Sequence, residues 1–261
     1  MNGTEQAYGF EVNDVTVRYG MHTALDSVSL KIDPGKQVGI VGPSGAGKTT
    51  LLRILNGTIA PTSGQVRVQD RSLAELSLRR MRRLQAQIGF VHQHLNIVPN
   101  LRVIRNVMCG GFGRQSFTGS LRSMLFPNRR EARAVYALLD RVGIAQKLYE
   151  RTDRLSGGQQ QRVAIARALY QQPMALLADE PVSDLDPARA RDTVSLLADL
   201  SREGGVTLCM SMHRLDLAKT FFPRLIGLRQ GQKVFDKPSE ELHDEEFRRL
   251  YRLTKDAEVE G

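Results

Sequence analysis

The order of apolar and polar residues along the chain predicts several strands. From residue 10 to residue 32 the two kinds alternate, which is typical of half-buried strands and predicts an antiparallel arrangement. Residues 65–68 repeat the alternation. Short apolar runs with the character of fully buried strands follow at residues 38–41, 88–91, 174–178, 206–210 and 225–228.

Apolar residues at helical spacing occupy the intervals between these runs. They predict helices over residues 48–56, 79–85, 102–108, 130–142, 188–202 and 215–220, and a short amphipathic helix at 239–251. Between residues 94 and 154 the pattern is helical, except where a stretch rich in Gly, Ser and Arg at 109–128 interrupts it. Strands that alternate with helices predict an α/β fold with a mostly parallel sheet, split by a helical insertion.

Composition narrows the class of protein. With 261 residues, 41% of them hydrophobic and 25% charged, the chain has the balance of one globular domain. Cys109 and Cys209 lie far apart and outside any metal-binding pattern, so we expect no disulfide framework and a reducing compartment. No signal-peptide pattern and no apolar run of the roughly 18–20 residues that span a bilayer are visible. We therefore expect any membrane association to involve a partner or the surface.

A net charge of +9 indicates an anionic partner. Nucleotides, nucleic acids and lipid surfaces all fit that description, and a solvated basic face is the alternative. Arg79, Arg80, Arg82, Arg83 and the arginines of residues 109–130 are candidates for the source of the charge. Proximity of these arginines to anionic lipid headgroups is a hypothesis.

A glycine-rich loop between a predicted strand and a predicted helix is a strong chemical signal. It fits the phosphate-binding pattern GxxxxGK[ST] at every fixed position, over Gly42, Pro43, Ser44, Gly45, Ala46, Gly47, Lys48 and Thr49. Glycines let backbone N–H groups approach phosphate oxygens, and the positive end of the following helix adds to the attraction. We expect Lys48 to reach the β- and γ-phosphates of a nucleotide, Thr49 to bind Mg²⁺, and Thr50 to belong to the same site. The alternative is a glycine-rich turn with a surface lysine.

Residues 175–180 form an apolar strand pattern that ends in two carboxylates, Asp179 and Glu180. At the carboxyl end of a central strand, Asp179 can hold the Mg²⁺ shell while Glu180 polarises the attacking water as general base. General-base catalysis contributes roughly 10²–10⁴-fold in rate. Acidic residues often end strands, so the pattern gains its meaning from the phosphate loop upstream.

A second glycine motif, LSGGQ, consists of Leu155, Ser156, Gly157, Gly158 and Gln159. Ser156 and Gln159 have the spacing of a capping box, which predicts that they close the start of the following helix. The two glycines leave N–H groups unobstructed for another phosphate. A simple helix cap is the alternative.

The phosphate loop, the acidic strand end and LSGGQ together resemble the ATP-binding-cassette (ABC) family over nearly the whole chain. The resemblance implies ATP and Mg²⁺ as cofactors, and a dimer in which LSGGQ of one copy faces the nucleotide held by the other. It also implies a P-loop NTPase core with an N-terminal antiparallel β subdomain and an inserted α-helical subdomain. On that division residues 9–93 and 160–235 form the core with the β lobe, 94–159 the helical subdomain, and 236–261 a C-terminal helix and tail.

Further roles follow from the same resemblance. Tyr19 is similar to the aromatic residue that stacks on adenine, although an ordinary strand tyrosine is the alternative. Gln93 resembles the Q-loop glutamine, which senses Mg²⁺ and water and links to the transmembrane partner. Asp186 lies in a segment that resembles the D-loop, and His213 resembles the switch histidine that contacts the γ-phosphate. With Lys48 and Glu180, His213 completes the expected catalytic set. 

His92 and His94 flank Gln93 at the spacing that places two residues on the same face of a strand, so they are candidate metal ligands. A metal site needs further ligands, and no third ligand is near them in the sequence. We therefore interpret both histidines as structural.

Four segments resemble the corresponding segments in the ATPases of phosphonate or phosphite importers, and they narrow the resemblance to that subfamily. They are residues 90–99, 179–182, 212–218 and 226–231. The chain departs from that subfamily at Ser183 and Asp184 in the D-loop, and at Ser211 and Met212 just before the switch histidine. We expect neither departure to touch the core chemistry.

The resemblance implies an ATP-hydrolysing subunit that powers an importer of phosphonates or related phosphorus oxyanions, on the cytoplasmic face of the cell membrane. The implied partners are a second copy of the chain, a transmembrane permease and, indirectly, a periplasmic or surface solute-binding protein. No nucleic-acid partner is expected, because the chain shows neither a long coiled-coil insertion nor a second cassette. The alternative is an ABC-type ATPase of a soluble complex, such as a phosphonate-degrading assembly.

Overall fold

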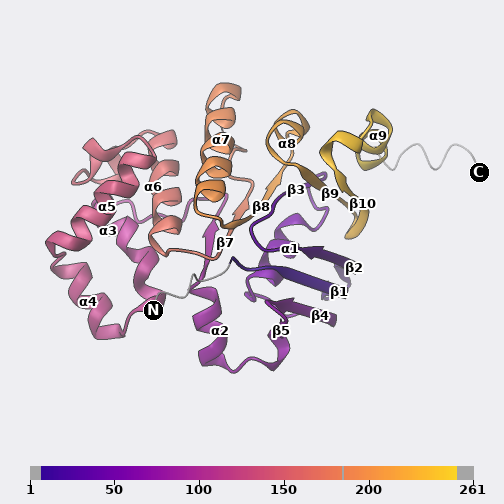
Figure 1. Ribbon diagram of the computed structural model, residues 1–261, viewed down its shortest axis with the longest axis horizontal. Coiled ribbons are helices and arrows are strands. Elements are labelled where there is room, and N and C mark those ends of the chain that lie inside the picture. Colours follow the sequence, from indigo (N-terminus) through magenta and orange to yellow (C-terminus); the bar gives the residue numbers. More distant parts are fainter. Residues whose placement is uncertain (1–6, 184, 252–261) are drawn as a thin grey trace, which may run out of the picture.

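The computed structural model describes residues 7–183 and 185–251 and arranges them in two sheets and a set of helices (Figure 1). The smaller sheet has the strand order β2-β1-β4-β5, and the larger sheet has the order β10-β9-β3-β8-β7-β6. The strands are β1 (Phe10–Tyr19), β2 (His22–Ile32), β3 (Gln37–Val41), β4 (Ser63–Val68), β5 (Arg71–Ser72), β6 (Ile88–Val91), β7 (Ala175–Asp179), β8 (Thr207–Met212), β9 (Arg224–Arg229) and β10 (Gln232–Pro238).

Helices cover the larger sheet and form a separate layer at one side of it (Figure 1). The α-helices are α1 (Lys48–Leu55), α2 (Leu78–Gln85), α3 (Val103–Met108), α4 (Phe117–Leu125), α5 (Arg129–Arg141), α6 (Gly157–Tyr170), α7 (Pro187–Glu203), α8 (Leu215–Phe221) and α9 (Asp244–Tyr251). Short 3₁₀ turns are η1 (Leu73–Glu75), η2 (Cys109–Arg114), η3 (Ala145–Lys147), η4 (Thr152–Arg154) and η5 (Ser239–Glu241). No helix in the described part of the chain combines the length and apolar character needed to cross a bilayer.

The smaller sheet confirms the antiparallel strands predicted for residues 10–32. β1 pairs antiparallel with β2, with Phe10 opposite Ile32 and Val12 opposite Leu30, and it pairs with β4 on its other side. Phe10, Val12, Leu30 and Ile32 are all buried. The alternating apolar residues therefore place one face of this sheet against the core of the molecule.

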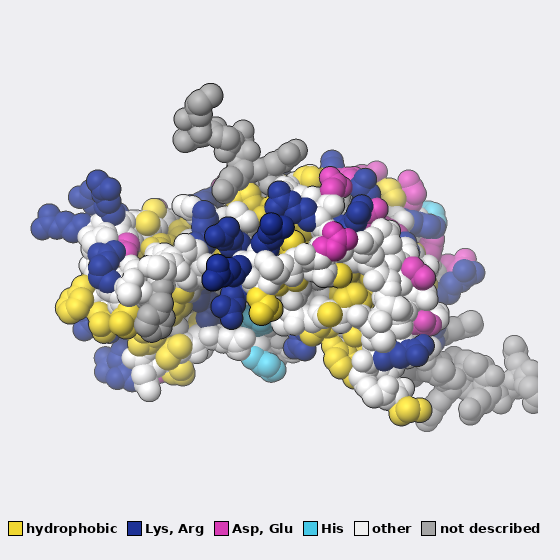
Figure 2. All heavy atoms as spheres, turned by 90° about the horizontal axis from the view of Figure 1, so that it is seen from below, with side chains coloured by type: hydrophobic (Ala, Val, Ile, Leu, Met, Phe, Trp, Pro, Cys, Tyr) yellow, Lys and Arg dark blue, Asp and Glu magenta, His cyan; other side chains and the backbone are white. Residues whose placement is uncertain are grey.

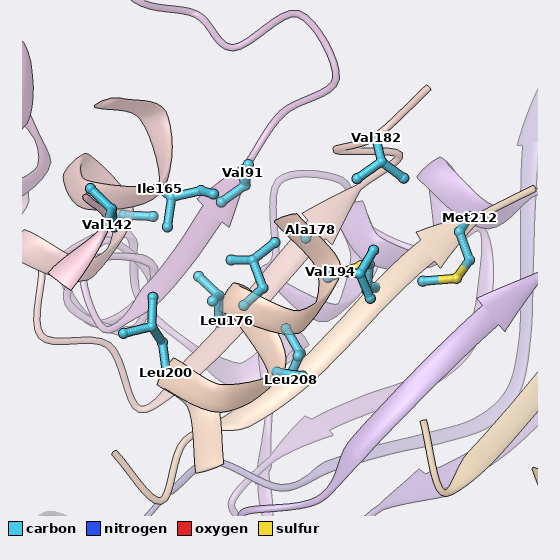
Figure 3. Packing of buried hydrophobic residues seen from close by; sticks show 14 of the residues in the cluster. Val91, Val142, Ile165, Leu176, Ala178, Val182, Val194, Leu200, Leu208 and Met212 are labelled. Atoms are coloured by element: carbon cyan, nitrogen blue, oxygen red, sulfur yellow. The ribbon is translucent and has the colours of Figure 1, made fainter. Parts of the chain in front are cut away.

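The parallel strands of the larger sheet are buried on both faces. On β7, Leu176 and Ala178 belong to the core that includes Val194 of α7 (Figure 3). The residues between them in sequence, Ala175 and Leu177, belong instead to the core formed with α1 and the smaller sheet. Because both faces of the strand are covered, its sequence is apolar throughout rather than alternating. β6, β7, β8, β3 and β9 are parallel neighbours, and β10 pairs antiparallel with β9.

The helical layer contains one helix that the sequence pattern did not predict. The stretch 109–128, expected to interrupt the helices, folds into η2 and α4. Ser116 caps α4 by accepting a hydrogen bond from the Gly119 N–H at 3.2 Å. α5 begins with a capping box, in which Asn128 accepts from the Glu131 N–H at 2.9 Å and donates its own N–H to the Glu131 carboxylate at 2.7 Å. Local caps thus fix helix starts in a segment whose glycine and serine content suggested irregular structure.

The C-terminal helix packs against β9 and β10, although it begins later than predicted. The pattern indicated a helix over residues 239–251, whereas α9 begins at Asp244 and follows η5. Leu250 is fully buried, and the Phe247 ring meets Phe235 of β10 edge to face, with ring centroids 5.8 Å apart. Residues 252–261 of the expected tail lie outside the described residues.

Candidate active site

The phosphate loop joins β3 to α1 in the larger sheet. β3 is buried along its whole length because β8 and β9 pair on either side of it. Gly42 (φ 156°) and Gly47 (φ 100°) have backbone conformations that favour glycine. A Cβ atom would lie 2.1 Å from the carbonyl oxygen of Leu228 at Gly42, and 2.5 Å from that of Ala24 at Gly47. The Leu228 and Ala24 backbones therefore approach the loop so closely that only glycine fits at positions 42 and 47.

Lys48, the first residue of α1, holds a buried positive charge with 4% of its surface exposed. Its Nζ donates hydrogen bonds to the carbonyl oxygens of Gly42 (2.8 Å) and Pro43 (3.0 Å). The same atom lies 3.1 Å from Oε1 of Glu180. Burial lowers the pKa of the Lys48 ammonium, and the charges of Glu180 and Asp179 oppose that shift. The site thus places one buried cation beside two carboxylates.

Thr49 and Asp179 come from different elements and meet through one hydrogen bond. Thr49 Oγ1 donates to Oδ1 of Asp179 at 3.1 Å, and Asp179 is buried at the carboxyl end of β7. An alcohol and a carboxylate at this separation are oxygen ligands of the kind that Mg²⁺ prefers. The described residues contain no cluster of three or more His, Cys, Asp or Glu that could hold a metal ion. Thr49 and Asp179 therefore offer two of the oxygen ligands that a Mg²⁺ ion would need.

Glu180 stands between Lys48 and His213. Its Oε1 lies 2.6 Å from His213 Nε2, in addition to its contact with Lys48. The Glu180 backbone is left-handed (φ 45°), a conformation that is uncommon for a residue with a side chain and is enriched at active sites. The Glu180 side chain is 14% exposed and that of His213 is 34% exposed, so a small molecule can reach the pair.

Ser211 joins the two carboxylate residues to β8. Its hydroxyl donates to Oδ1 of Asp179 at 2.7 Å and accepts from the Glu180 N–H at 2.9 Å. β7 and β8 are parallel neighbours, and Asp179 lies in register with Ser211. Ser211 therefore contacts both residues of the acidic strand end, a connection that the sequence analysis did not predict. In the sequence its only signal was its position two residues before His213.

The LSGGQ segment leads into α6. Ser156 Oγ accepts from the Gln159 N–H (3.4 Å) and Gln159 Oε1 accepts from the Ser156 N–H (3.1 Å), which confirms the predicted capping box. Leu155 is buried, whereas Gly157 is exposed, and a Cβ on Gly157 would meet no other group within 4 Å. Within the described part of the chain, no hydrogen bond links this segment to the phosphate loop. The segment therefore presents the open backbone of Gly157 at the surface.

Gln93 follows β6, and the residues after it are held by α6. Leu95 (φ 48°) and Asn96 (φ 47°) both have left-handed backbones. Arg167 of α6 donates hydrogen bonds to the carbonyl oxygens of Leu95 (2.6 Å) and Asn96 (2.5 Å). The helix that starts at LSGGQ thus fixes the segment that follows Gln93, a connection that the sequence analysis did not predict.

The two histidines beside Gln93 occupy different surroundings. His92 packs on the Phe90 ring, with ring centroids 4.3 Å apart, and burial together with the nearby charge of Arg167 lowers the pKa of its imidazole. His94 is exposed. The interpretation of His92 as a packing residue agrees with these contacts.

Tyr19 and Asp186 lie outside the cluster around Glu180. Tyr19 ends β1, is 48% exposed and stands opposite His22 of β2. Asp186 caps α7 by accepting a hydrogen bond from the Arg189 N–H at 3.1 Å. Asp184, in the same D-loop segment, lies outside the described residues. The roles expected of Tyr19 and Asp186 therefore depend on a nucleotide or on a second copy of the chain.

The chain matches known protein sequences over most of its length. Residues 25–183 match the family model described as ABC transporter. The chain is 41% identical over 242 residues to the phosphonates import ATP-binding protein PhnC 3 of Halalkalibacterium halodurans, which covers 92% of this chain and 93% of that protein. It is 42% identical over 236 residues to PhnC of Pseudomonas putida, covering 90% and 87%. PhnC of Anaeromyxobacter dehalogenans is 46% identical over 239 residues, which are 92% of this chain but only 47% of that longer protein.

Solved structures show the same fold. The dimeric structure of MJ0796, a bacterial ABC transporter cassette, superposes with a TM-score of 0.78 at 30% identity and covers 89% of this chain and 100% of that one. A second dimeric structure of MJ0796, in a post-hydrolysis state with ADP and Pi, gives a TM-score of 0.73 at 31% identity over the same 89% of this chain and 100% of that one. cbiO1 from Clostridium perfringens, part of the ABC transporter complex cbiONQ, gives 0.79 at 25% identity and covers 97% of this chain and 98% of that one.

Proposed function

This chain belongs to the ABC transporter family, and we propose that it is the ATP-hydrolysing subunit of a membrane importer for phosphonates or related phosphorus oxyanions. Three relatives named as phosphonates import ATP-binding proteins align with 90% or more of the chain. The observation that carries the catalytic part of the proposal is the meeting of Lys48, Glu180 and His213 beside the Thr49–Asp179 pair.

ATP would bind with its phosphates along the loop that precedes α1. Lys48 would turn its ammonium from Glu180 toward the β- and γ-phosphate oxygens, and the positive end of α1 would add to the attraction. Thr49 and Asp179 would hold Mg²⁺, because their oxygen atoms already converge. The ion, when bound, would neutralise part of the charge on the phosphates.

Two residues at the rim complete the proposed nucleotide site. Tyr19 belongs to the antiparallel lobe, which meets the phosphate loop where the Ala24 carbonyl approaches Gly47. An exposed ring on that lobe is available to stack on the base. Gln93 follows β6, the neighbour of β7, and its half-buried amide would reach the Mg²⁺ shell or the attacking water.

Hydrolysis would use Glu180 as general base. A water molecule between Glu180 and the γ-phosphate loses its proton to the carboxylate as its oxygen attacks phosphorus, and the bond to the β–γ bridging oxygen breaks to release ADP. His213 would align Glu180 with the γ-phosphate, since its Nε2 already lies 2.6 Å from the carboxylate. Ser211 would fix the direction of both β7 carboxylates.

A second copy of the chain would complete each ATP site. The exposed Gly157 and the half-buried Gly158 of LSGGQ would face the γ-phosphate held by the partner, and Asp186 would lie at the crossing between the two sites. The solved MJ0796 dimers support this arrangement because the chain shares their fold over 89% of its length. ATP would close the dimer, and hydrolysis with phosphate release would reopen it.

The chain would divide into three parts. Residues 9–93 and 160–235 would form the nucleotide core with its β lobe, and residues 94–159 would form the helical subdomain that carries LSGGQ. Residues 236–261 would form a C-terminal extension. The segment after Gln93 would contact the permease. Because Arg167 of α6 is hydrogen-bonded to this segment, a movement of α6 would move the segment with it.

The chain would work at the cytoplasmic face of the membrane beneath a permease that converts dimer closure into alternating access. A solute-binding protein would deliver the solute from the other side. The ATPase would not touch the solute, so the assignment to phosphonates rests on kinship with the named relatives. Nothing in the described part of the chain favours a soluble phosphonate-degrading assembly.

Growth on defined phosphorus sources tests the proposal. A strain that lacks the gene should grow on phosphate but fail on a phosphonate or on phosphite. The intact gene should restore growth, and the matched Glu180→Gln gene should not. Normal growth of the deletion strain on all three sources, with no compensating importer, would contradict the proposed solute class.

A further inference from the structure

The positive charge of the chain comes from one continuous segment, residues 76–130, called here the basic segment. It contains no Asp, Glu or Lys but ten arginines, which are Arg79, Arg80, Arg82, Arg83, Arg102, Arg105, Arg114, Arg122, Arg129 and Arg130. The chain has 37 Lys and Arg residues and 28 Asp and Glu residues. When the ten arginines are subtracted from the 37, the 27 basic residues that remain are one fewer than the acidic ones. The net charge of +9 is therefore a property of the basic segment.

The fold gathers much of this charge on one face. A groove of about 680 Å³ between α2 and η2 is lined by Arg71, Arg80, Arg83 and Arg114. A neighbouring groove of about 830 Å³ runs between α2 and α4 and shares part of its lining with the first. Figure 2 shows Lys and Arg side chains gathered near the middle of this face, over the place of α2 in Figure 1, and hydrophobic ones to their left.

The arginines of α2 do not serve the fold through ion pairs. Arg79, Arg80, Arg82 and Arg83 are exposed, and none of them forms a salt bridge with any residue in the described ranges. Like charges on one short helix repel one another and so oppose helix formation. An anion outside the chain would offset this repulsion.

Exposed apolar side chains occur on α2 and on and just after α4. Leu78, at the start of α2, is 80% exposed, and Phe126, just after α4, is 74% exposed. Leu121 and Leu125 of α4 are each 50% exposed. Nucleic-acid phosphates would satisfy the arginines but would leave these side chains in water. Basic residues mixed with protruding apolar ones are typical of surfaces that meet anionic lipid at a membrane interface.

We propose that α2 and α4 form a docking surface for anionic phospholipid headgroups. The α2 arginines bind lipid phosphates, while Leu78 and Phe126 enter the boundary between headgroups and acyl chains. The inference rests on the proposed function only in placing the chain beside a membrane. It adds a lipid-dependent attachment to the attachment through the permease, and it uses none of the residues assigned to ATP.

Co-sedimentation of the full chain with vesicles, in the absence of the permease, tests the proposal. Vesicles of phosphatidylglycerol mixed with phosphatidylcholine are compared with phosphatidylcholine alone. The test variant replaces Arg79, Arg80, Arg82 and Arg83 by Gln. The matched control removes the same charge at exposed positions elsewhere, through Lys31→Gln, Lys36→Gln, Arg133→Gln and Arg248→Gln.

We expect the wild-type chain to bind the anionic vesicles and to be released by salt only in part, because salt screens the arginines but not the apolar contacts. The α2 variant should bind at least about 10-fold more weakly, whereas the control should lose no more than about 3-fold. ATP hydrolysis in solution should be unchanged in both variants, which shows that both fold. A Leu78→Gln, Phe126→Gln variant should lose the part of the binding that persists at high salt.

Equal losses in the α2 variant and the control would overturn the proposal, because binding would then follow net charge alone. Equal binding to the two kinds of vesicle would also overturn it. A wild-type chain that hydrolyses ATP but binds neither kind would overturn the lipid surface while leaving the proposed ATPase intact. In that case an acidic segment of the permease becomes the better partner for the α2 arginines.

Discussion

Nε2 of His213 lies 2.6 Å from Oε1 of Glu180, although more than thirty residues separate the two in the chain. Glu180 follows β7 and His213 follows β8, and these strands are parallel neighbours whose carboxyl ends meet at one edge of the sheet. On the other side of Glu180 stands Lys48, at 3.1 Å. The sheet thus holds one carboxylate between an imidazole and an ammonium group, next to the proposed Mg²⁺ ligands.

Glu180→Gln should abolish turnover while preserving nucleotide binding. The amide keeps the shape of the side chain but cannot accept a proton from water. We expect the rate of ATP hydrolysis to fall by roughly 10²–10⁴-fold, measured as phosphate release at saturating ATP. ATP affinity, measured by calorimetry, should remain within about 3-fold of wild type, which corresponds to a change of about 0.6 kcal/mol in binding free energy. Turnover close to that of wild type would contradict the general-base role.

Ser211→Ala should lower turnover more than it lowers stability. The change removes the donor to Asp179 and one of the acceptors for the Glu180 N–H, so both carboxylates lose a positional restraint. A hydrogen bond worth about 1 kcal/mol corresponds to a loss of about 5- to 10-fold in kcat. Ser201→Ala is the matched control, because Ser201 is also buried and donates to the Val206 carbonyl. It should lower the melting temperature similarly but leave kcat unchanged; equal kcat in the two variants would show that Ser211 only supports the fold.

Gly157→Ala should distinguish between two interpretations of LSGGQ, a simple helix cap and a segment that binds the partner's nucleotide. A Cβ at this position would meet no other group, and alanine is better than glycine in a helix, so the variant should fold with stability equal to wild type or up to about 1 kcal/mol higher. If the exposed backbone binds the partner's nucleotide, the added methyl group should nevertheless reduce ATP hydrolysis by at least about 10-fold, or about 1.4 kcal/mol. Full activity in the more stable variant would favour the simple cap.

The attachment of α9 should depend on pH through Glu246. Its hydrogen bonds with Lys237 and with the His243 N–H lower the pKa of Glu246 from 4.5 to about 2. Because the folded pKa lies below the unfolded one, the stabilisation is complete above pH 4.5 and is lost as the pH falls toward 2. Glu246→Gln should therefore lower the melting temperature at neutral pH, and the difference from wild type should narrow across that window.

Glu245→Gln serves as the control for this pH dependence. Glu245 is exposed on the same helix and pairs with Arg249 at 2.9 Å, so the control removes the same charge and one surface ion pair. It should change the melting temperature less than Glu246→Gln does. A difference for Glu246→Gln that stays constant from neutral pH to pH 2 would refute the assigned contacts.

The features readable from the sequence were those fixed by neighbours in the chain. The phosphate loop and the capping box of LSGGQ depend on residues a few positions apart, and so do the apolar runs of the buried strands. The contact of Ser211 with Asp179 was not predicted, because it depends on the register of β8 against β7, which brings the two together across 32 residues. Arg167 was missed for the same reason, since it reaches Leu95 across 72 residues of sequence.

Two elements escaped the sequence analysis for reasons of composition. α4 contains glycine and serine, and its start is fixed by the Ser116 cap rather than by strong helical propensity. β10 is an edge strand with mostly exposed residues and a single buried side chain, Phe235, so it lacks the apolar run of its neighbours. Both elements became visible only through their partners in the fold.

The mass of the Glu180→Gln chain in solution, by light scattering with ATP and with ADP, tests the shared ATP site most directly. The proposal predicts twice the mass of one chain with ATP and the mass of one chain with ADP, because only ATP joins a phosphate loop to the LSGGQ of a partner. Adding Gly157→Ala to the same chain should remove the dimer. A chain that binds ATP and stays monomeric at every concentration tested would contradict the account.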